Sequence, residues 1–188
     1  FINELREAVI SHPAVRHPFL QQLSTSGFNQ IDDVIRDYSH QYSFYSGWFP
    51  EYVQSVIDST DDPRIIHPLA ENLAEELGLD DTDSNNIPHT ELYKTFKKDI
   101  GIDAEFENEN PMCLTVSLWR ELFLQKCKSE NTAVGVAALG LATEFIVPHF
   151  YPFIIDALEK HSSFPNECSF FFRLHVECDE GHAEEALD

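Results

Sequence analysis

The sequence predicts an all-α protein, and three observations carry this prediction. Apolar and aromatic residues recur at helical spacing over long stretches, most clearly between Phe28 and Asp58. Glycine is scarce, with 7 residues among 188, and alternating β-branched runs of the kind found in strands are few. The length suits a single domain over residues 1–188 that buries one sizeable core.

The first third of the chain is expected to supply short helices and one long one. Residues 2–24 are expected to form two short helical segments separated by a His-Pro break, with the second segment starting at Pro18. A long helix is expected over residues 28–58 because its apolar stripe is broad and continuous. Gly47 and Pro50 predict a kink within this helix.

Start and stop signals delimit the later helices. Asp62 is expected to cap the helix that begins at Pro63, and Gly78 is expected to end it. Polar loops are expected over residues 79–87 and 101–110. The remaining helices are expected from Pro88 to the second loop, over residues 111–128, over residues 131–147, from there to residue 160, and from residue 167 onward.

The acidic composition excludes several kinds of partner. The formal net charge is -21 at pH 7, and nucleic acids and anionic membrane surfaces both require basic patches. We expect no membrane-spanning segment, because no apolar run appears long enough, and no signal peptide is visible. None of the four cysteines forms a Cys-x-x-Cys pair, so free thiols and a cytoplasmic location are expected.

Three polar residues near the end of the chain have the spacing of a metal site. His175, Asp179 and His182 are four and then three residues apart, so an α-helix would place all three on one face. Two imidazoles and a carboxylate on one helix face are typical ligands of a transition metal.

Three further polar residues fall on otherwise apolar helix faces. Glu76 follows Leu69 and Leu73 on the apolar face of its helix, where an unpaired carboxylate would be costly. His89 lies just across the next loop. Glu144 is the charged residue of the strongly apolar stretch 131–147, and small residues precede it on the same face.

The six residues together suggest a metal centre more strongly than any of them alone, since six buried polar groups would otherwise need six separate partners. Three carboxylates and three imidazoles suit a pair of iron or manganese ions held in a helical bundle. Helical phase also predicts an apolar substrate pocket, with no Arg or Lys clearly placed to bind a carboxylate. The predicted pocket residues are Tyr42, Tyr45, Phe49, Phe96 and Phe171.

The chain resembles the haem-oxygenase-like diiron oxidases and oxygenases, which share a structural superfamily with TenA and PqqC-like proteins. The resemblance rests on three blocks in the same order: residues 71–78 with His89, residues 139–144, and residues 175–182. Residues 38–50 are similar to the first long helix of that family. The resemblance implies a bundle of about seven helices, whose last helix, expected after the third block, is absent from this chain.

The resemblance also implies an activity. Members of that family use dioxygen to oxidise small organic substrates, here an amino-acid-derived, acyl or aromatic compound, at two iron ions of which one is often loosely held. A homodimer is expected, whereas the electron donor is not indicated. The implied catalytic carboxylates are Glu76, Glu144 and Asp179. In the implied ligand set, Glu76 and His89 bind one iron, His175, Asp179 and His182 bind the other, and Glu144 bridges them.

Two alternatives stay open. One is a metal-independent enzyme on the same fold, either a thiaminase-like hydrolase with Cys178 as nucleophile or an enzyme that oxidises a cofactor. The other is a binding protein that keeps the fold without catalysis. Residues 145–158 contain no Lys, which argues against chemistry that consumes the protein's own side chains.

Overall fold

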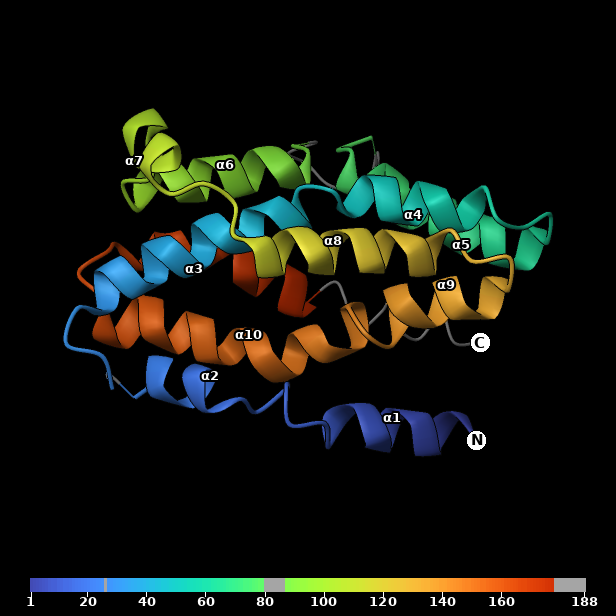
Figure 1. Ribbon diagram of the computed structural model, residues 1–188, viewed down its shortest axis with the longest axis horizontal. Coiled ribbons are helices and arrows are strands. Elements are labelled where there is room, and N and C mark those ends of the chain that lie inside the picture. The colour runs from blue at the N-terminus through green and yellow to red at the C-terminus, as the bar shows by residue number, and fades with distance from the viewer. Residues whose placement is uncertain (26, 80–86, 178–188) are drawn as a thin grey trace.

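The computed structural model describes residues 1–25, 27–79 and 87–177, and every regular element within these ranges is helical (Figure 1). The prediction of an all-α fold is therefore confirmed. The elements are α1 (Ile2–Ile10), α2 (Pro18–Leu23), α3 (Ile31–Ser46), α4 (Phe49–Ile57), α5 (Pro63–Glu76), α6 (His89–Asp99), α7 (Ala104–Glu109), α8 (Leu114–Cys127), α9 (Thr132–Gly140), η1 (Glu144–Ile146), α10 (Val147–Asp156), η2 (Ala157–His161), η3 (Asn166–Ser169) and a last helix over residues 170–177.

The predicted long helix is present as two helices, α3 and α4. The break falls at residues 47–48, and Pro50 lies in the first turn of α4, where a missing backbone N–H leaves no hydrogen bond unmade. The two helices follow one another along the long axis of the bundle (Figure 1). The predicted kink is thus a complete interruption. Helix α5 packs against α4, and α6 packs against α3 (Figure 1).

Two local predictions were wrong. Residues 101–110 contain helix α7, because the Asp103 carboxylate accepts hydrogen bonds from the backbone N–H groups of Glu105 and Phe106 and so caps a helix. Helix α9 ends at Gly140 instead of continuing to residue 147. The Thr143 hydroxyl donates to the carbonyl of Ala138, which satisfies the last turn of α9 without a further turn of helix.

The helices enclose two groups of buried apolar side chains. The first lies between α3, α6, α10 and the last helix, with Ile35, Phe96 and Phe172 among its members. The second lies between α4, α8 and α9 and includes Leu139. Tyr42, on α3, packs against both groups. The junction of the two groups therefore lies beside α3.

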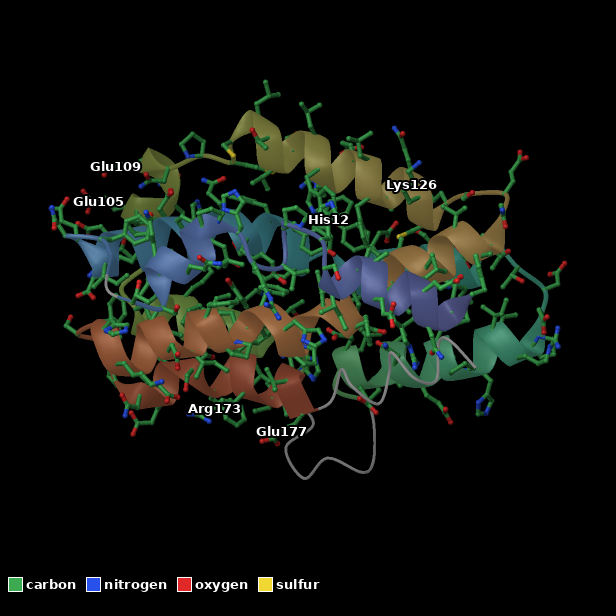
Figure 2. The ribbon with its side chains drawn as sticks, turned by 90° about the horizontal axis from the view of Figure 1, so that it is seen from below. His12, Glu105, Glu109, Lys126, Arg173 and Glu177 are labelled. Atoms are coloured by element: carbon green, nitrogen blue, oxygen red, sulfur yellow. The ribbon has the colours of Figure 1, made fainter. Side chains whose placement is uncertain are left out.

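Charged side chains cover the outside of this bundle. Figure 2 shows Glu105 and Glu109 on α7, Lys126 on α8, and Arg173 and Glu177 on the last helix, and all five are exposed. The strong negative charge of the chain is carried largely on this surface, where water solvates it.

The expectation that no apolar run is long enough to span a membrane is wrong for one helical run. Residues Thr132–His161 are long and apolar enough to cross a membrane, judged by length and composition alone. In the bundle this run supplies buried core residues, including Leu139, Tyr151 and Ile154. Core helices of globular proteins pass the same test, so the run is weak evidence for a membrane segment.

Replacing Leu139 by alanine should destabilise the protein. Leu139 is fully buried in the second apolar group, so Leu139→Ala should lower the free energy of unfolding by about 2–5 kcal/mol. Urea denaturation followed by far-ultraviolet circular dichroism measures the change. The matched control is Leu118→Ala, since Leu118 on α8 is 54% exposed and its truncation should change the stability by less than about 0.5 kcal/mol. Equal effects of the two substitutions would contradict this packing.

The buried tyrosines should make the fold sensitive to high pH. Burial raises the pKa of the Tyr42, Tyr45 and Tyr93 hydroxyls above the ordinary value of 10.0. In the unfolded chain these hydroxyls ionise near pH 10, so the free energy of unfolding falls as the pH rises above that value. Tyrosinate absorbance at 295 nm should therefore appear together with loss of helical circular dichroism. Ionisation of all six tyrosines near pH 10 with the helices intact would contradict the prediction.

Candidate metal centre and cavity

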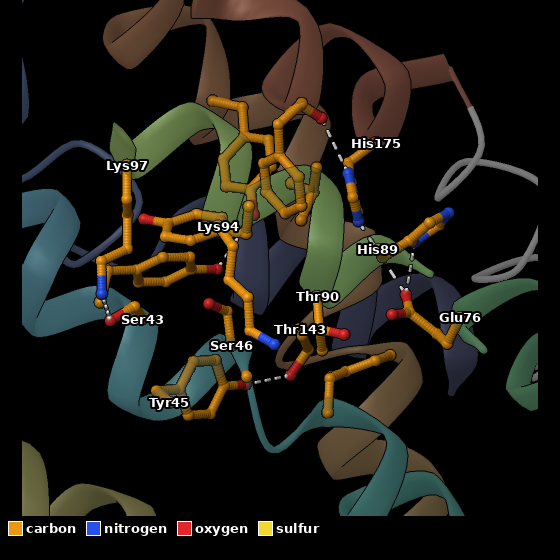
Figure 3. Close-up of a pocket in the computed structure, with 17 residues that line it drawn as sticks. Ser43, Tyr45, Ser46, Glu76, His89, Thr90, Lys94, Lys97, Thr143 and His175 are labelled. Atoms are coloured by element: carbon orange, nitrogen blue, oxygen red, sulfur yellow. Dashed lines mark hydrogen bonds and ion pairs between the residues drawn. The ribbon is translucent and has the colours of Figure 1, made fainter. Parts of the chain in front are cut away.

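Three of the predicted ligands converge at one point of the bundle. Glu76 is the last residue of α5, His89 is the first residue of α6, and His175 lies on the last helix. Glu76 Oε1 lies 3.0 Å from His89 Nδ1 and 3.9 Å from His175 Nε2. One ligand atom from each of the three residues lies within 4.8 Å of the other two (Figure 3).

Local sequence signals bring Glu76 and His89 to this point. The N–H of Leu79 bonds to the carbonyl of Ala74 and the N–H of Gly78 bonds to that of Glu75, which is a Schellman motif. Gly78 adopts a φ of 65°, a conformation that glycine enters without steric cost. The predicted stop at Gly78 is confirmed, and α5 ends with Glu76 beside the first residue of α6.

A backbone hydrogen bond orients the third ligand. His175 Nδ1 lies 2.8 Å from the carbonyl oxygen of Phe171, one turn earlier on the same helix. Because a carbonyl only accepts hydrogen bonds, Nδ1 must carry the proton, and in the neutral ring the lone pair is then on Nε2. Nε2 is the atom that faces Glu76. This is the arrangement in which histidine binds metals through one nitrogen and is held by the other.

The three side chains fit a transition-metal ion. Two neutral imidazoles and one carboxylate are the ligands of many non-haem iron sites. Ligand atoms about 2.1 Å from one ion and at right angles to each other are about 3 Å apart. The separation of Glu76 Oε1 from His89 Nδ1 is already of that size. The Glu76, His89 and His175 side chains are only 9%, 12% and 9% exposed, so an ion held there would be largely shielded from water.

Glu144 is buried nearby, but it lies outside this group. It is 2% exposed, on η1, and its carboxylate accepts a hydrogen bond from the side-chain amide of Asn72. Asn72 precedes Glu76 by four residues, so the two share a face of α5, about 6 Å apart along its axis. Among the described residues, the group with ligand atoms within 4.8 Å of one another comprises Glu76, His89 and His175.

Some of the site residues predicted near the end of the sequence, within 175–182, are not among those that the structure describes. Asp179 and His182 lie outside the described residues, as does Cys178, the nucleophile of the thiaminase-like alternative. Their contribution to a metal site stays a prediction.

The metal ligands open onto a cavity of about 350 Å³ between α3, α6, α10 and the last helix. Four of the five predicted pocket residues, Tyr42, Tyr45, Phe49 and Phe171, line it. Phe96 does not line it: it is 3% exposed and packs edge-to-face against Tyr93 and Phe172 in the apolar core. The helical phase of Phe96 is compatible with a place in the cavity wall or in the core. The packing of the last helix against α6 places Phe96 in the core.

Hydroxyl groups form part of the cavity wall. The Tyr45 hydroxyl lies 3.0 Å from that of Thr143, and because Thr143 donates to the Ala138 carbonyl, Tyr45 is the donor of the pair. The Tyr42 and Tyr151 hydroxyls are also 3.0 Å apart. Burial raises the pKa of Tyr42 and Tyr45, so both keep their protons at neutral pH. The wall therefore presents neutral, hydrogen-bonding tyrosines.

The structure also places lysines in the cavity wall, contrary to the expectation from the sequence. Lys94 and Lys97, both on α6, line the cavity. The signal was present in the sequence, because His89, Tyr93 and Lys97 are spaced by four residues and so share one face of α6. Phe96 was predicted on this face, whereas Lys97 is the residue that lines the cavity.

Two proteins of known activity are similar to this chain over nearly its whole length. The 4-chloro-allylglycine synthase of Streptantibioticus cattleyicolor is 26% identical, with 100% of this chain and 69% of that protein covered. The 4-aminobenzoate synthase of Chlamydia muridarum is 25% identical, with 98% of this chain and 75% of that protein covered.

A solved structure is similar in fold, and a family profile matches most of the chain. The crystal structure of a TenA homologue from Pseudomonas syringae pv. tomato has a TM-score of 0.72 at 17% identity, covering 97% of this chain and 72% of the homologue. The bundle is therefore of the haem-oxygenase-like, TenA-like type. The profile of the iron-containing redox enzymes matches residues 36–188, which include Glu76, His89 and His175. The chain belongs to the family of iron-containing redox enzymes.

Proposed function

We propose that this chain is a non-haem iron oxidase or oxygenase that uses dioxygen to oxidise a small organic substrate held in the cavity. The observation that carries the proposal is the convergence of Glu76, His89 and His175 at the wall of a cavity of about 350 Å³. The membership in an iron-containing redox family supports iron as the metal. Two imidazoles and one carboxylate suit iron, and manganese, which prefers oxygen ligands, is the second candidate.

The distances favour one ion shared by all three residues. Glu76 Oε1 is within 3.9 Å of both imidazole nitrogens, so we place Glu76, His89 and His175 around the same ion. This differs from the division implied by the family resemblance, in which His175 serves the other ion. A second, weaker iron site would then use Glu144 together with Asp179 and His182 from the part of the chain outside the described residues.

The described side chains would prepare the site in three ways. The Phe171 carbonyl keeps the proton of His175 on Nδ1, so Nε2 stays available as a ligand. The aromatic walls exclude water, which strengthens electrostatic interactions in the site. The neutral Tyr42 and Tyr45 hydroxyls, already paired with Tyr151 and Thr143, keep oxygen lone pairs that can accept a hydrogen bond from a polar group of the substrate. Bound iron would supply the redox chemistry that reduces dioxygen.

The cavity and the relatives support a proposal for the class of substrate. The cavity is lined by aromatic side chains and hydroxyls and suits a molecule of moderate size. The two relatives are named for an allylglycine and an aminobenzoate, and both names denote small carboxylic acids. We therefore propose an amino-acid-derived, acyl or aromatic substrate. A homodimer belongs to the same proposal, as does a cytoplasmic location, which the lack of Cys-x-x-Cys pairs supports.

Anaerobic titration with Fe(II), read by isothermal calorimetry and by metal analysis after desalting, tests the metal site. The wild-type chain should bind iron, and Glu76→Ala and His175→Ala should each weaken the tighter site by about 100-fold or more, because each removes a ligand. The control is His67→Ala, since His67 lies on α5 with a side chain that is 75% exposed, away from the cavity. Absence of iron binding, or equal loss in the His67→Ala variant, would refute the site.

Oxygen consumption tests the proposed chemistry separately. Iron-loaded wild-type protein should consume dioxygen faster than metal-free protein, and Glu76→Ala should abolish the difference. An oxygen electrode measures the rate directly, without knowledge of the substrate. If the iron-loaded and metal-free proteins consumed dioxygen equally, the metal-independent alternative on the same fold would be favoured.

A further inference from the structure

The cavity has a second polar end, away from the metal ligands. Figure 3 shows Lys97 and Ser43 at one side of the cavity and Glu76, His89 and His175 at the other. Lys97 follows His89 by eight residues on α6, so their backbone positions are about 12 Å apart along the helix. The two ends are thus joined by one rigid element, which sets the distance between them.

Lys97 is held in place and keeps donor capacity. Its ammonium lies 2.6 Å from a carboxylate oxygen of Glu107 and 3.3 Å from the hydroxyl of Ser43. Ser43 in turn donates to the carbonyl of His40, which orients its oxygen as the acceptor for Lys97. An ammonium has three donors, and these two partners use two of them. With its side chain 13% exposed, Lys97 can offer the third to a molecule in the cavity.

Ser46 supplies an independent indication of a ligand. It follows Ser43 by three residues on α3 and lines the same cavity. Within the described part of the chain, its buried hydroxyl oxygen has no hydrogen-bond partner. Buried polar groups without partners are uncommon and call for an explanation, and a polar ligand in the cavity would provide one. Lys94 also lines the cavity, but its side chain is 68% exposed and its ammonium pairs with Glu91, so the buried ammonium at this end is that of Lys97.

Cationic residues are few in this chain. The formal net charge is -21, with 12 Lys and Arg against 33 Asp and Glu, yet two of the lysines line this cavity. The excess of acidic groups would repel an anion from most of the surface. Both lysines pair with carboxylates, Lys97 with Glu107 and Lys94 with Glu91. This end of the cavity therefore offers an anionic group the remaining charged N–H donor of Lys97 and not an excess of positive charge.

We propose that Lys97, with Ser43 and Ser46, binds a carboxylate of the substrate at the end of the cavity away from Glu76, His89 and His175. The substrate is then an extended carboxylic acid whose carboxylate is fixed by α3 and α6, and whose distant carbon atoms reach the metal ligands. This assignment of the substrate class rests on the proposed function. The binding of the carboxylate itself does not require iron.

Calorimetry with paired probes tests the inference. Hexanoate and hexanamide have the same chain and differ in charge, and each is titrated into the purified chain as isolated and again after chelation of metal. Hexanoate should bind the wild type, and Lys97→Met should weaken its binding about 10-fold or more, because a charged hydrogen bond is lost. Hexanamide should bind weakly and equally to both proteins. Lys97→Arg should retain most of the hexanoate affinity.

The matched control is Lys98→Met. Lys98 neighbours Lys97 on α6, is exposed and does not line the cavity, so the two variants have the same net charge and helix composition. Circular dichroism checks that both are folded. The inference is overturned if hexanoate does not bind the wild type saturably, if Lys97→Met binds it as tightly as Lys98→Met does, or if hexanamide binds as well as hexanoate. Because chelated protein is included, failure of iron binding would leave this result interpretable.

Discussion

The close approach of the Glu76 carboxylate to two imidazoles is the interaction on which the arrangement of the site depends. A carboxylate that is 9% exposed must be neutralised or bonded, since leaving it alone in an apolar interior is costly. His89 and His175 come from segments 13 and 99 residues further along the chain, so this contact ties α5, α6 and the last helix together. A bound cation would satisfy all three groups at once. The stability of this part of the bundle and the function of the site are therefore linked.

The cavity lies beside α3, where the two apolar groups of the core meet. Tyr42 packs against both, and its hydroxyl pairs with that of Tyr151, while Tyr45 donates to Thr143. The paired hydroxyls satisfy one another's hydrogen-bonding capacity within the cavity wall. A buried hydroxyl without a partner would destabilise the fold, and a larger apolar side chain would fill the cavity. The same break that ends α9 and leaves Thr143 free of the helix thus helps to form the cavity wall.

The cavity is polar at both ends and aromatic between them, so a substrate with one anionic end would bind in one orientation. The end formed by α5, α6 and the last helix presents ligands for a cation, and the end with Lys97 presents a cation for an anionic ligand. Because α6 contributes to both ends, the distance between them is set by a rigid helix and not by loops. In a substrate held in this way, the carbon atoms near the metal ligands and the carboxylate near Lys97 are kept apart by the length of α6. The relatives, named for small carboxylic acids, are compatible with such a cavity.

The sequence alone determined the helical class, the capping of α5 by Asp62 and Gly78, and the identity of Glu76, His89 and His175 as polar residues on apolar faces. These features are local, because periodicity and caps depend on residues within a few turns of each other. Tertiary structure decided which neighbour each face meets: Phe96 packs in the core, Lys97 reaches the cavity, and Glu144 pairs with Asn72 instead of joining the three ligands. Periodicity specifies the residues that share a helix face, whereas the position of the facing helix depends on contacts between segments far apart in the chain.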